Sequence, residues 1–319
     1  MTTTFTNLSS RVAVAAIGIP VILLAAYFGS IWFFLLVAGI AILSLKEFYN
    51  LAKAKGALPQ TGIGIAGILF LHLAFFHEQI QYSVLPLFFG AEGISLLTKL
   101  QLLLTIFFIL LTVIFIYELF RNAGSIFLNA GFTILGVVYI GLFLSSLVGI
   151  RELFGDEFPL VLAMQSGVIN GSLSSIIKTT TYSWGGATVV SIFASIWICD
   201  TAAYFGGLSM GKHKLFPRVS PKKSWEGAIW GFFGAVATMI VAQKFFLPYL
   251  AFHQAVIMGI LIGVFGQLGD LVESLFKRDA GVKDSSAIIP GHGGVLDRFD
   301  SLIFVSPILY LYIDFVVLS

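Results

Sequence analysis

Runs of about 20 apolar residues recur along almost the whole chain, and they constrain its fold more than any other feature. A helix needs a run of this length to cross a bilayer, whereas the strands of an outer-membrane barrel are shorter and alternate in polarity. The chain is therefore predicted to be an all-α integral membrane protein, a polytopic bundle of about nine transmembrane helices. The helices are expected near residues 11–29, 31–48, 61–77, 99–119, 126–149, 184–206, 227–246, 254–275 and 301–318.

The composition agrees with a membrane setting. Hydrophobic residues make up 58% of the chain, far more than in a soluble globular domain. The net charge of +2 is too small to suggest a nucleic-acid partner. The apolar run Val12–Phe28 is expected to stay in place as the first helix, because no basic segment of the kind that opens a signal peptide precedes it.

Two stretches are too short to span a bilayer. Residues 82–93, interrupted by Pro86, are predicted to form an interfacial or re-entrant segment, and residues 158–168 part of an outer loop or an interfacial helix. The polar residues divide the chain into two regions. Residues 1–180 are expected to form about five hydrophobic helices and the outer loop, and residues 181–319 a catalytic membrane region of about four spans with two active-site loops.

Basic residues predict the orientation of the bundle. With nine spans and a cytoplasmic N-terminus, fourteen of the 18 Lys and Arg residues fall on the cytoplasmic side, as the positive-inside rule expects. The loops at 207–226 and 276–300 carry most of this bias. We therefore expect a multi-pass protein of the cell inner (plasma) membrane, with its N-terminus and both loops in the cytoplasm.

Charged residues concentrate in and beside these two loops, although only 11% of the chain is charged. The segment Ser274–Asp300 alone holds eight charged side chains and a histidine. Asp200 and Asp270 lie at the boundaries of apolar helices, where a carboxylate is costly unless it pairs with a cation or binds a metal. Asp270 precedes Glu273 and Ser274 by about one helical turn, so all three can share a helix face.

A second pair of carboxylates opens the last helix. Asp297 and Asp300 are three residues apart, a spacing at which side chains on a helix can converge. Oxygen ligands of this kind suit magnesium, which proteins often hold with one or two carboxylates plus substrate phosphates. The alternative is that neighbouring cations, such as Arg298 or Lys277, neutralise these acids as ion pairs.

The cations of the two loops exceed what neutralising the acids would require if the acids hold a metal, so a polyanionic partner is implied. Anionic lipid head groups and a nucleoside triphosphate both fit this requirement. In the glycine-rich run 290–294, backbone N–H groups can approach phosphate closely, and His292 either serves phosphate binding or proton transfer or holds the loop. The cations are Lys222, Lys223, Lys277, Arg278, Lys283 and Arg298.

Two other features predict no chemistry. Residues 206–212 match part of a phosphate-binding loop, but His213 replaces the required Ser or Thr and a membrane helix precedes the run. Cys199, the single cysteine, is expected to be a small buried hydrophobe.

Residues 274–300 read S-x2-K-R-x4-K-D-x-S-x3-P-x-H-G-G-x2-D-R-x-D, a pattern that resembles the signature of the phosphatidate cytidylyltransferases, or CDP-diacylglycerol synthases. An earlier block is similar to a second segment shared by that family. The resemblance covers roughly residues 200–319. The earlier block comprises Asp200, Ala203, Tyr204, Gly211, Lys212, Ser220, Pro221, Lys222, Lys223, Ser224, Glu226 and Gly227.

The resemblance implies a reaction of CTP with phosphatidic acid that yields CDP-diacylglycerol and pyrophosphate, the committed step of phospholipid biosynthesis. It also implies Mg²⁺, a second cation such as K⁺, and a homodimer. The implied metal ligands are Asp270 and Asp297, with Asp300 as a further candidate, and the implied catalytic residues are Asp270, Asp297, Lys277 and Arg298. The implied substrate-binding residues are Ser220, Lys222, Lys223, Ser274, Arg278, Lys283, Asp284, His292, Gly293 and Gly294.

A diacyl substrate must reach the site sideways from the inner leaflet, while CTP arrives from the cytosol. A polar cavity is therefore expected at the cytoplasmic membrane boundary, lined by the ends of the helices that carry Asp200 and Asp270. Two alternatives remain open. A CDP-archaeol synthase or a polyprenol-type lipid kinase would share the nucleotide and metal but use another lipid, and a transporter or lipid scaffold would bind anions without turnover.

Overall fold

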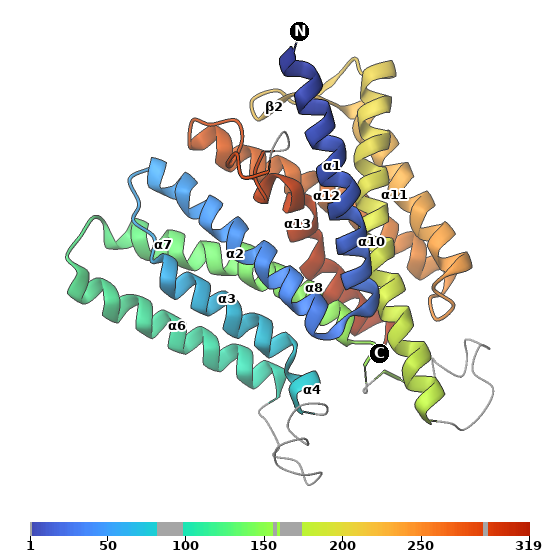
Figure 1. The fold of residues 1–319 in the computed structure, drawn as a ribbon, viewed down its shortest axis with the longest axis horizontal. Coiled ribbons are helices and arrows are strands. Elements are labelled where there is room, and N and C mark those ends of the chain that lie inside the picture. The colour runs from blue at the N-terminus through green and yellow to red at the C-terminus, as the bar shows by residue number, and fades with distance from the viewer. Residues whose placement is uncertain (1, 82–97, 156–157, 160–173, 290–292) are drawn as a thin grey trace.

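The computed structural model describes residues 2–81, 98–155, 158–159, 174–289 and 293–319. Helices make up nearly all of this part of the chain, and one pair of short strands lies between them (Figure 1). The elements are α1 (Thr2–Phe28), α2 (Ser30–Ala54), α3 (Thr61–Phe75), α4 (His77–Gln79), α6 (Lys99–Arg121), α7 (Ile126–Gly136), the π-helix η2 (Val137–Leu142), α8 (Phe143–Glu152), α10 (Ser174–Met210), β1 (Lys214–Phe216), β2 (Ser220–Ser224), α11 (Trp225–Phe245), α12 (Phe252–Asp279), α13 (Leu296–Tyr312) and the π-helix η3 (Ile313–Val317).

Each of the nine predicted spans coincides with a helical segment. Within the described residues, seven segments are long and apolar enough to cross a membrane, and the shorter apolar helices Val14–Phe28 and Thr61–Phe75 account for the other two. The prediction of an all-α polytopic membrane protein is thus confirmed. Residues 82–93 and most of 158–168, for which interfacial segments were predicted, lie outside the described residues.

The helix ends differ from the predicted ones where polar loops begin. α12 continues to Asp279 instead of residue 275, and α10 to Met210 instead of residue 206. In α12 the hydropathy window stops just before the basic residues Lys277 and Arg278. The helical hydrogen bonds continue past them, because the charged side chains there find partners at the polar end of the bundle.

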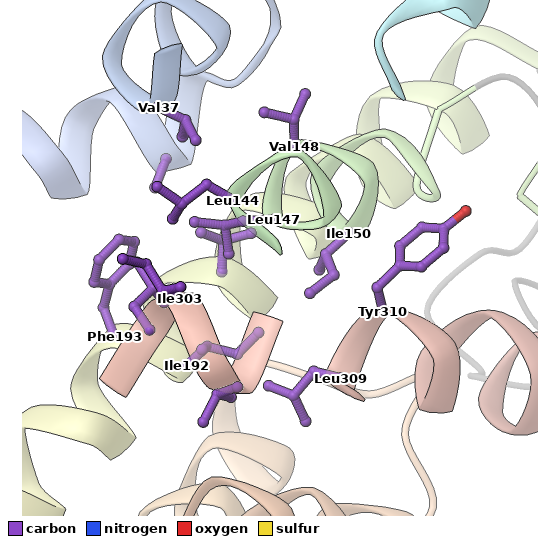
Figure 2. Close-up of a cluster of buried hydrophobic side chains, with 14 of the residues drawn as sticks. Val37, Leu144, Leu147, Val148, Ile150, Ile192, Phe193, Ile303, Leu309 and Tyr310 are labelled. Carbon is purple, nitrogen blue, oxygen red and sulfur yellow. The ribbon is translucent and has the colours of Figure 1, made fainter. Parts of the chain in front are cut away.

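The core lies where α2, α8, α10 and α13 meet, and Figure 2 shows part of it. Helices from both predicted regions, 1–180 and 181–319, contribute to this one core cluster. Outside the core, large apolar side chains such as Phe108, Phe120 and Phe127 stay exposed, as expected of helices that face lipid. The labelled core side chains are Val37, Leu144, Leu147, Val148, Ile150, Ile192, Phe193, Ile303, Leu309 and Tyr310.

Helices α10 and α11 pack closely through small residues. A Cβ atom added at Gly227 would lie 2.6 Å from the Ala203 carbonyl oxygen, and one at Gly231 would lie 2.9 Å from the Cys199 carbonyl oxygen. Only glycine permits this approach between the two backbones. Cys199 is buried between the helices, as expected.

The strands β1 and β2 form an antiparallel hairpin between α10 and α11, at the same end of the molecule as the N-terminus (Figure 1). The sequence pattern predicts no strand here, because the two strands are short, rich in lysine and interrupted by Pro221. The C-terminus lies toward the opposite end of the bundle.

Candidate functional site

The loop between α10 and β1 is fixed by the first residues of α11. Ser224 caps this helix, and its Oγ accepts a hydrogen bond of 3.2 Å from the Gly227 N–H. The Glu226 carboxylate accepts hydrogen bonds from the backbone N–H groups of Lys212 and His213 at 3.1 and 3.3 Å, and it lies 2.7 Å from His213 Nδ1. Together these contacts hold the hairpin against the end of α10.

Lys223 on β2 and Asp270 on α12 form an ion pair, with Nζ 2.5 Å from Oδ2. The Ser274 Oγ donates to the other Asp270 oxygen at 3.3 Å, so the expected shared helix face of these two residues is confirmed. Ser220 and Lys222 lie on the same strand as Lys223, and the Lys222 side chain is exposed. The pair therefore joins the first loop to α12, the helix that leads into the second loop.

Lys277 lies buried between two carboxylates. Its Nζ is 2.5 Å from Glu273 Oε2 and 2.7 Å from Asp297 Oδ1. Asp297 Oδ2 also accepts hydrogen bonds from the Gly294 N–H at 2.8 Å and from the Ser285 N–H and Oγ, both at 3.1 Å. Asp297, at the start of α13, thus links this helix to the end of α12 and to the α12–α13 loop.

Glu47 of α2 also binds this loop, and the sequence did not point to it. Its buried carboxylate accepts hydrogen bonds from the hydroxyls of Ser285 and Ser286 at 2.8 and 2.6 Å, and from the N–H groups of Val295 and Leu296 at 3.0 and 2.8 Å. The available signal was a carboxylate inside an apolar helix, which by itself suggests a role.

The other predicted residues of the α12–α13 loop differ in their surroundings. The Arg278 guanidinium donates to the carbonyl oxygens of Val219 and Val282 at 3.2 and 3.1 Å, which ties α12 to the hairpin and to its own loop. Lys283 and Asp284 are exposed.

Two glycines of the same loop are needed for different reasons, Gly293 for its backbone conformation and Gly294 for lack of space. Gly293 has a φ of +85°, a conformation that glycine adopts readily, and a Cβ at Gly294 would collide with Ser285 Oγ and Glu47. His292, predicted to bind substrate, lies outside the described residues.

Two cavities adjoin at Asp200, which lines both. The first, of about 510 Å³, is also lined by Lys222, Lys223 and Asp270. The second, of about 530 Å³, is walled mainly by apolar side chains of α1, α2, α10 and α13. Its polar lining consists of Asp200, Arg298, Asp300 and Ser301. A cavity with a charged lining and an amphipathic cavity thus share one carboxylate.

Asp300 interacts electrostatically with Asp200, Asp270 and Glu273. Its buried carboxylate accepts a hydrogen bond of 2.6 Å from the Ser301 N–H. Lys223 and Arg298 are the cations that act on this acidic group. In the described part of the chain, no three or more His, Cys, Asp or Glu side chains are arranged to hold a metal ion, so the predicted ligands Asp270, Asp297 and Asp300 stay a prediction.

The profile of the cytidylyltransferase family matches residues 9–316. The chain belongs to this family. It is 32% identical to a phosphatidate cytidylyltransferase of Bacillus subtilis over 305 residues, which are 95% of this chain and 97% of that relative. A phosphatidate cytidylyltransferase of Synechocystis sp. is 31% identical over 307 residues, 96% of each chain. One of Staphylococcus aureus is 48% identical over 123 residues, 38% of this chain and 46% of that relative.

The match extends beyond the two loops in this cytidylyltransferase. The resemblance seen in the sequence covers roughly residues 200–319, whereas the family match begins at residue 9 and so includes most of α1 and all of α2. These helices wall the second cavity and carry Glu47. The N-terminal half is therefore part of the family's fold and lies beside the site.

Proposed function

We propose that this multi-pass membrane protein is a phosphatidate cytidylyltransferase, which converts CTP and phosphatidate to CDP-diacylglycerol and pyrophosphate. The adjoining cavities carry this proposal, because one has a charged lining that includes two lysines, the other is largely apolar, and Asp200 lines both. A water-soluble nucleotide and a membrane lipid can then meet at a shared boundary. The similarity to relatives of that name over nearly the whole chain supports the same reaction.

The polar cavity suits the nucleotide. Lys222 and Lys223 supply positive charge for a triphosphate, and the Lys222 ammonium makes no ion pair in the described residues. Lys223 is already oriented by Asp270, so it can neutralise phosphate without a large loss of side-chain entropy.

The second cavity suits the lipid. Residues such as Ile19 of α1, Ile40 of α2 and Phe193 of α10 supply an apolar wall for acyl chains, and Arg298 lies where a lipid phosphate would need a cation. A diacyl lipid can then reach the site from within the bilayer, between helices, without leaving the membrane.

The chemical step needs positioning and charge neutralisation more than proton transfer. A phosphatidate oxygen attacks the α-phosphorus of CTP in line, a new P–O bond forms, and the bond to the β-phosphate oxygen breaks, so that pyrophosphate leaves with the electron pair. Phosphatidate is already ionised at neutral pH, so no general base is required. Lys222, Lys223 and Arg298 stabilise the charge on the two phosphate groups.

The carboxylate oxygens at the junction of the cavities are of the type that magnesium prefers, and since no three of them are arranged around one point in the described residues, substrate phosphates would have to complete the site. Asp200, Asp270 and Asp300 are three mutually repelling carboxylates near two cations, Lys223 and Arg298, and a hard cation with oxygen ligands would relieve the remaining repulsion. Asp270 and Asp300 would hold it, together with substrate phosphates. Bound there, Mg²⁺ would supply positive charge to the reacting phosphates. Asp270 would first have to give up its ion pair with Lys223, and Asp297, the other predicted ligand, its bond with Lys277.

The orientation follows from charge. The hairpin, the α12–α13 loop and the N-terminus are proposed to face the cytoplasm of the cell inner membrane, since most basic residues gather at that end. CTP is available in that compartment.

The decisive experiment is to incubate purified protein with labelled CTP, Mg²⁺ and phosphatidate in mixed micelles. We expect pyrophosphate and a lipid-soluble cytidine product to form together. No pyrophosphate release would contradict the enzyme assignment and favour a binding protein. Replacing phosphatidate by an archaeal ether lipid or a polyprenol tests the related lipid enzymes, and faster turnover with either would change the assigned substrate.

A further inference from the structure

We propose that Glu47 of α2 is a positioning residue, which holds the α12–α13 loop in the geometry that cytidylyl transfer requires. This inference rests on the proposed function. Glu47 lines neither of the two cavities that adjoin at Asp200. It therefore acts on the reaction through the loop residues that it binds.

The Glu47 carboxylate caps the N-terminus of α13. The N–H groups of Val295 and Leu296, at 3.0 and 2.8 Å, belong to the first turn, where N–H groups have no partner within the helix. A carboxylate at this end also interacts favourably with the helix dipole. Glu47, from a distant helix, thus supplies the cap that α13 lacks in its own sequence, since Val295 at its N-cap position makes no side-chain hydrogen bond.

Ser285 links Glu47 to the predicted catalytic residues. Its Oγ lies 2.8 Å from Glu47 Oε2 and 3.1 Å from Asp297 Oδ2, so one hydroxyl bridges two carboxylates. Asp297 in turn binds Lys277, which binds Glu273. The space beside this bridge is filled, because a Cβ at Gly294 would collide with both Ser285 and Glu47. Four hydrogen bonds to Glu47, from Ser285, Ser286, Val295 and Leu296, therefore hold the loop in this closely packed conformation.

Glu47 is itself held rigidly. The next residue, Phe48, is buried, and its ring packs edge-on against Phe276 of α12 at 5.3 Å. Tyr49 is buried as well, and its hydroxyl donates to the Thr133 carbonyl oxygen at 2.9 Å. A carboxylate on such a fixed element can define the position of a loop to within a fraction of an ångström.

The expected kinetic effect follows from which residues the loop places. It leads directly into Arg298 and Asp300, which line the lipid-side cavity, whereas in the described residues no hydrogen bond or ion pair joins it to Lys222 or Lys223 on the hairpin. Loss of Glu47 should therefore lower kcat and leave the KM for CTP nearly unchanged. A general loss of folded protein would lower the apparent kcat as well, so a structural measurement is required.

The kinetic test compares three variants of the full-length protein. We expect Glu47→Gln, which keeps the shape but removes the charge, to lower kcat by roughly 10- to 100-fold, the range for residues that orient direct ligands. Glu47→Asp should restore part of the rate because it keeps the charge. The matched control is Glu118→Gln, another buried carboxylate of the N-terminal half, which binds Gln60, Asn129 and Arg121 and should retain normal kcat.

The structural test is limited digestion with trypsin at Lys283, which is exposed within the loop. Cleavage should be faster in Glu47→Gln than in the wild type or in Glu118→Gln, because the loop opens more often. Unchanged kcat with unchanged cleavage in Glu47→Gln would overturn the proposal, and so would equal losses of kcat in both Gln variants.

A milder variant keeps the proposal testable if Glu47→Gln does not fold. Ser286→Ala removes one of the hydrogen bonds to Glu47 and should lower kcat in the same direction but less. Combined with Glu47→Asp, its effect should be smaller than the sum of the two single effects, since both changes act on one network. Strict additivity would contradict the proposal. Wild-type protein without turnover would reject the proposed function, while the cleavage rates would still decide whether Glu47 holds the loop.

Discussion

Asp270 and Asp279 lie on the same helix, α12, but in very different surroundings. Asp270 pairs with Lys223 and lines the polar cavity, whereas Asp279 makes an exposed ion pair with Lys55 at 3.2 Å. We expect Asp270→Asn to lower kcat by roughly 100-fold or more, because it removes a charge from the reacting centre. Asp279→Asn is the matched control and should keep near-normal kcat, since an exposed pair contributes about 0–1 kcal/mol to stability. Equal rates of pyrophosphate release in the two variants would remove Asp270 from the site.

Sequence spacing was a partial guide at the residue scale. It correctly paired Asp270 with Ser274, which are in hydrogen-bond contact one helical turn apart. It suggested that Asp297 and Asp300 converge, but Asp297 binds Lys277 while Asp300 interacts with Asp200 and Asp270. Spacing on a helix gives the relative direction of two side chains, and the partners on other helices decide which of them act together.

At the scale of elements, the close contact of α10 and α11 keeps the hairpin over the polar cavity. A Cβ at Gly227 would lie 2.6 Å from the Ala203 carbonyl oxygen, so Gly227→Ala must push the helices apart. We expect the free energy of unfolding to fall by about 1–3 kcal/mol. We also expect a higher KM for CTP, because Lys222 and Lys223 lie on the hairpin and would be displaced with it.

Thermal unfolding in detergent and initial rates at varied CTP concentration check this expectation. Gly62→Ala is the control, because a Cβ at Gly62 in α3 meets nothing within 4 Å. It should be neutral or slightly stabilising, as alanine is the better helix former. An unchanged KM for CTP in a destabilised Gly227→Ala variant would show that the hairpin does not depend on this contact.

Hydropathy predicted the helices well because each apolar run is long and needs no distant partner to form in a bilayer. The hairpin could not be predicted in this way. Glu226 and Ser224 hold it in place, and their partners lie in the preceding loop and in the first turn of α11.

At the scale of the whole molecule, the second cavity is expected to admit lipid from the bilayer. Gly18 of α1 lines this cavity, and a side chain added there meets no neighbour within 4 Å. Gly18→Phe should therefore fold normally, fill the cavity and raise the KM for phosphatidate while leaving the KM for CTP unchanged.

Gly39→Phe in α2 is the matched control, because Gly39 also has open space but does not line the cavity. Kinetics at varied phosphatidate surface concentration distinguish the two variants. Equal KM values for phosphatidate would argue against this cavity as the lipid site.

The proposed orientation makes the two ends of the bundle chemically distinct. Lys55, beside the α12–α13 loop, should be cytoplasmic, and His253, at the start of α12, should lie outside. A membrane-impermeant maleimide should label His253→Cys in intact cells and Lys55→Cys only after the membrane is disrupted. The buried Cys199 gives the wild type as an unlabelled reference. The reverse pattern would invert the topology.

The sequence by itself determined the class of fold, the number of helices and the two charged segments, because hydropathy and motif spacing are local properties of the chain. Only the tertiary structure decided which charged groups meet. It placed Lys277 between Glu273 and Asp297, set Asp200 at the junction of two cavities, and brought Glu47 from α2 to a loop more than two hundred residues away. Contacts of this kind depend on how the helices pack, and helix packing is a property of the whole bundle.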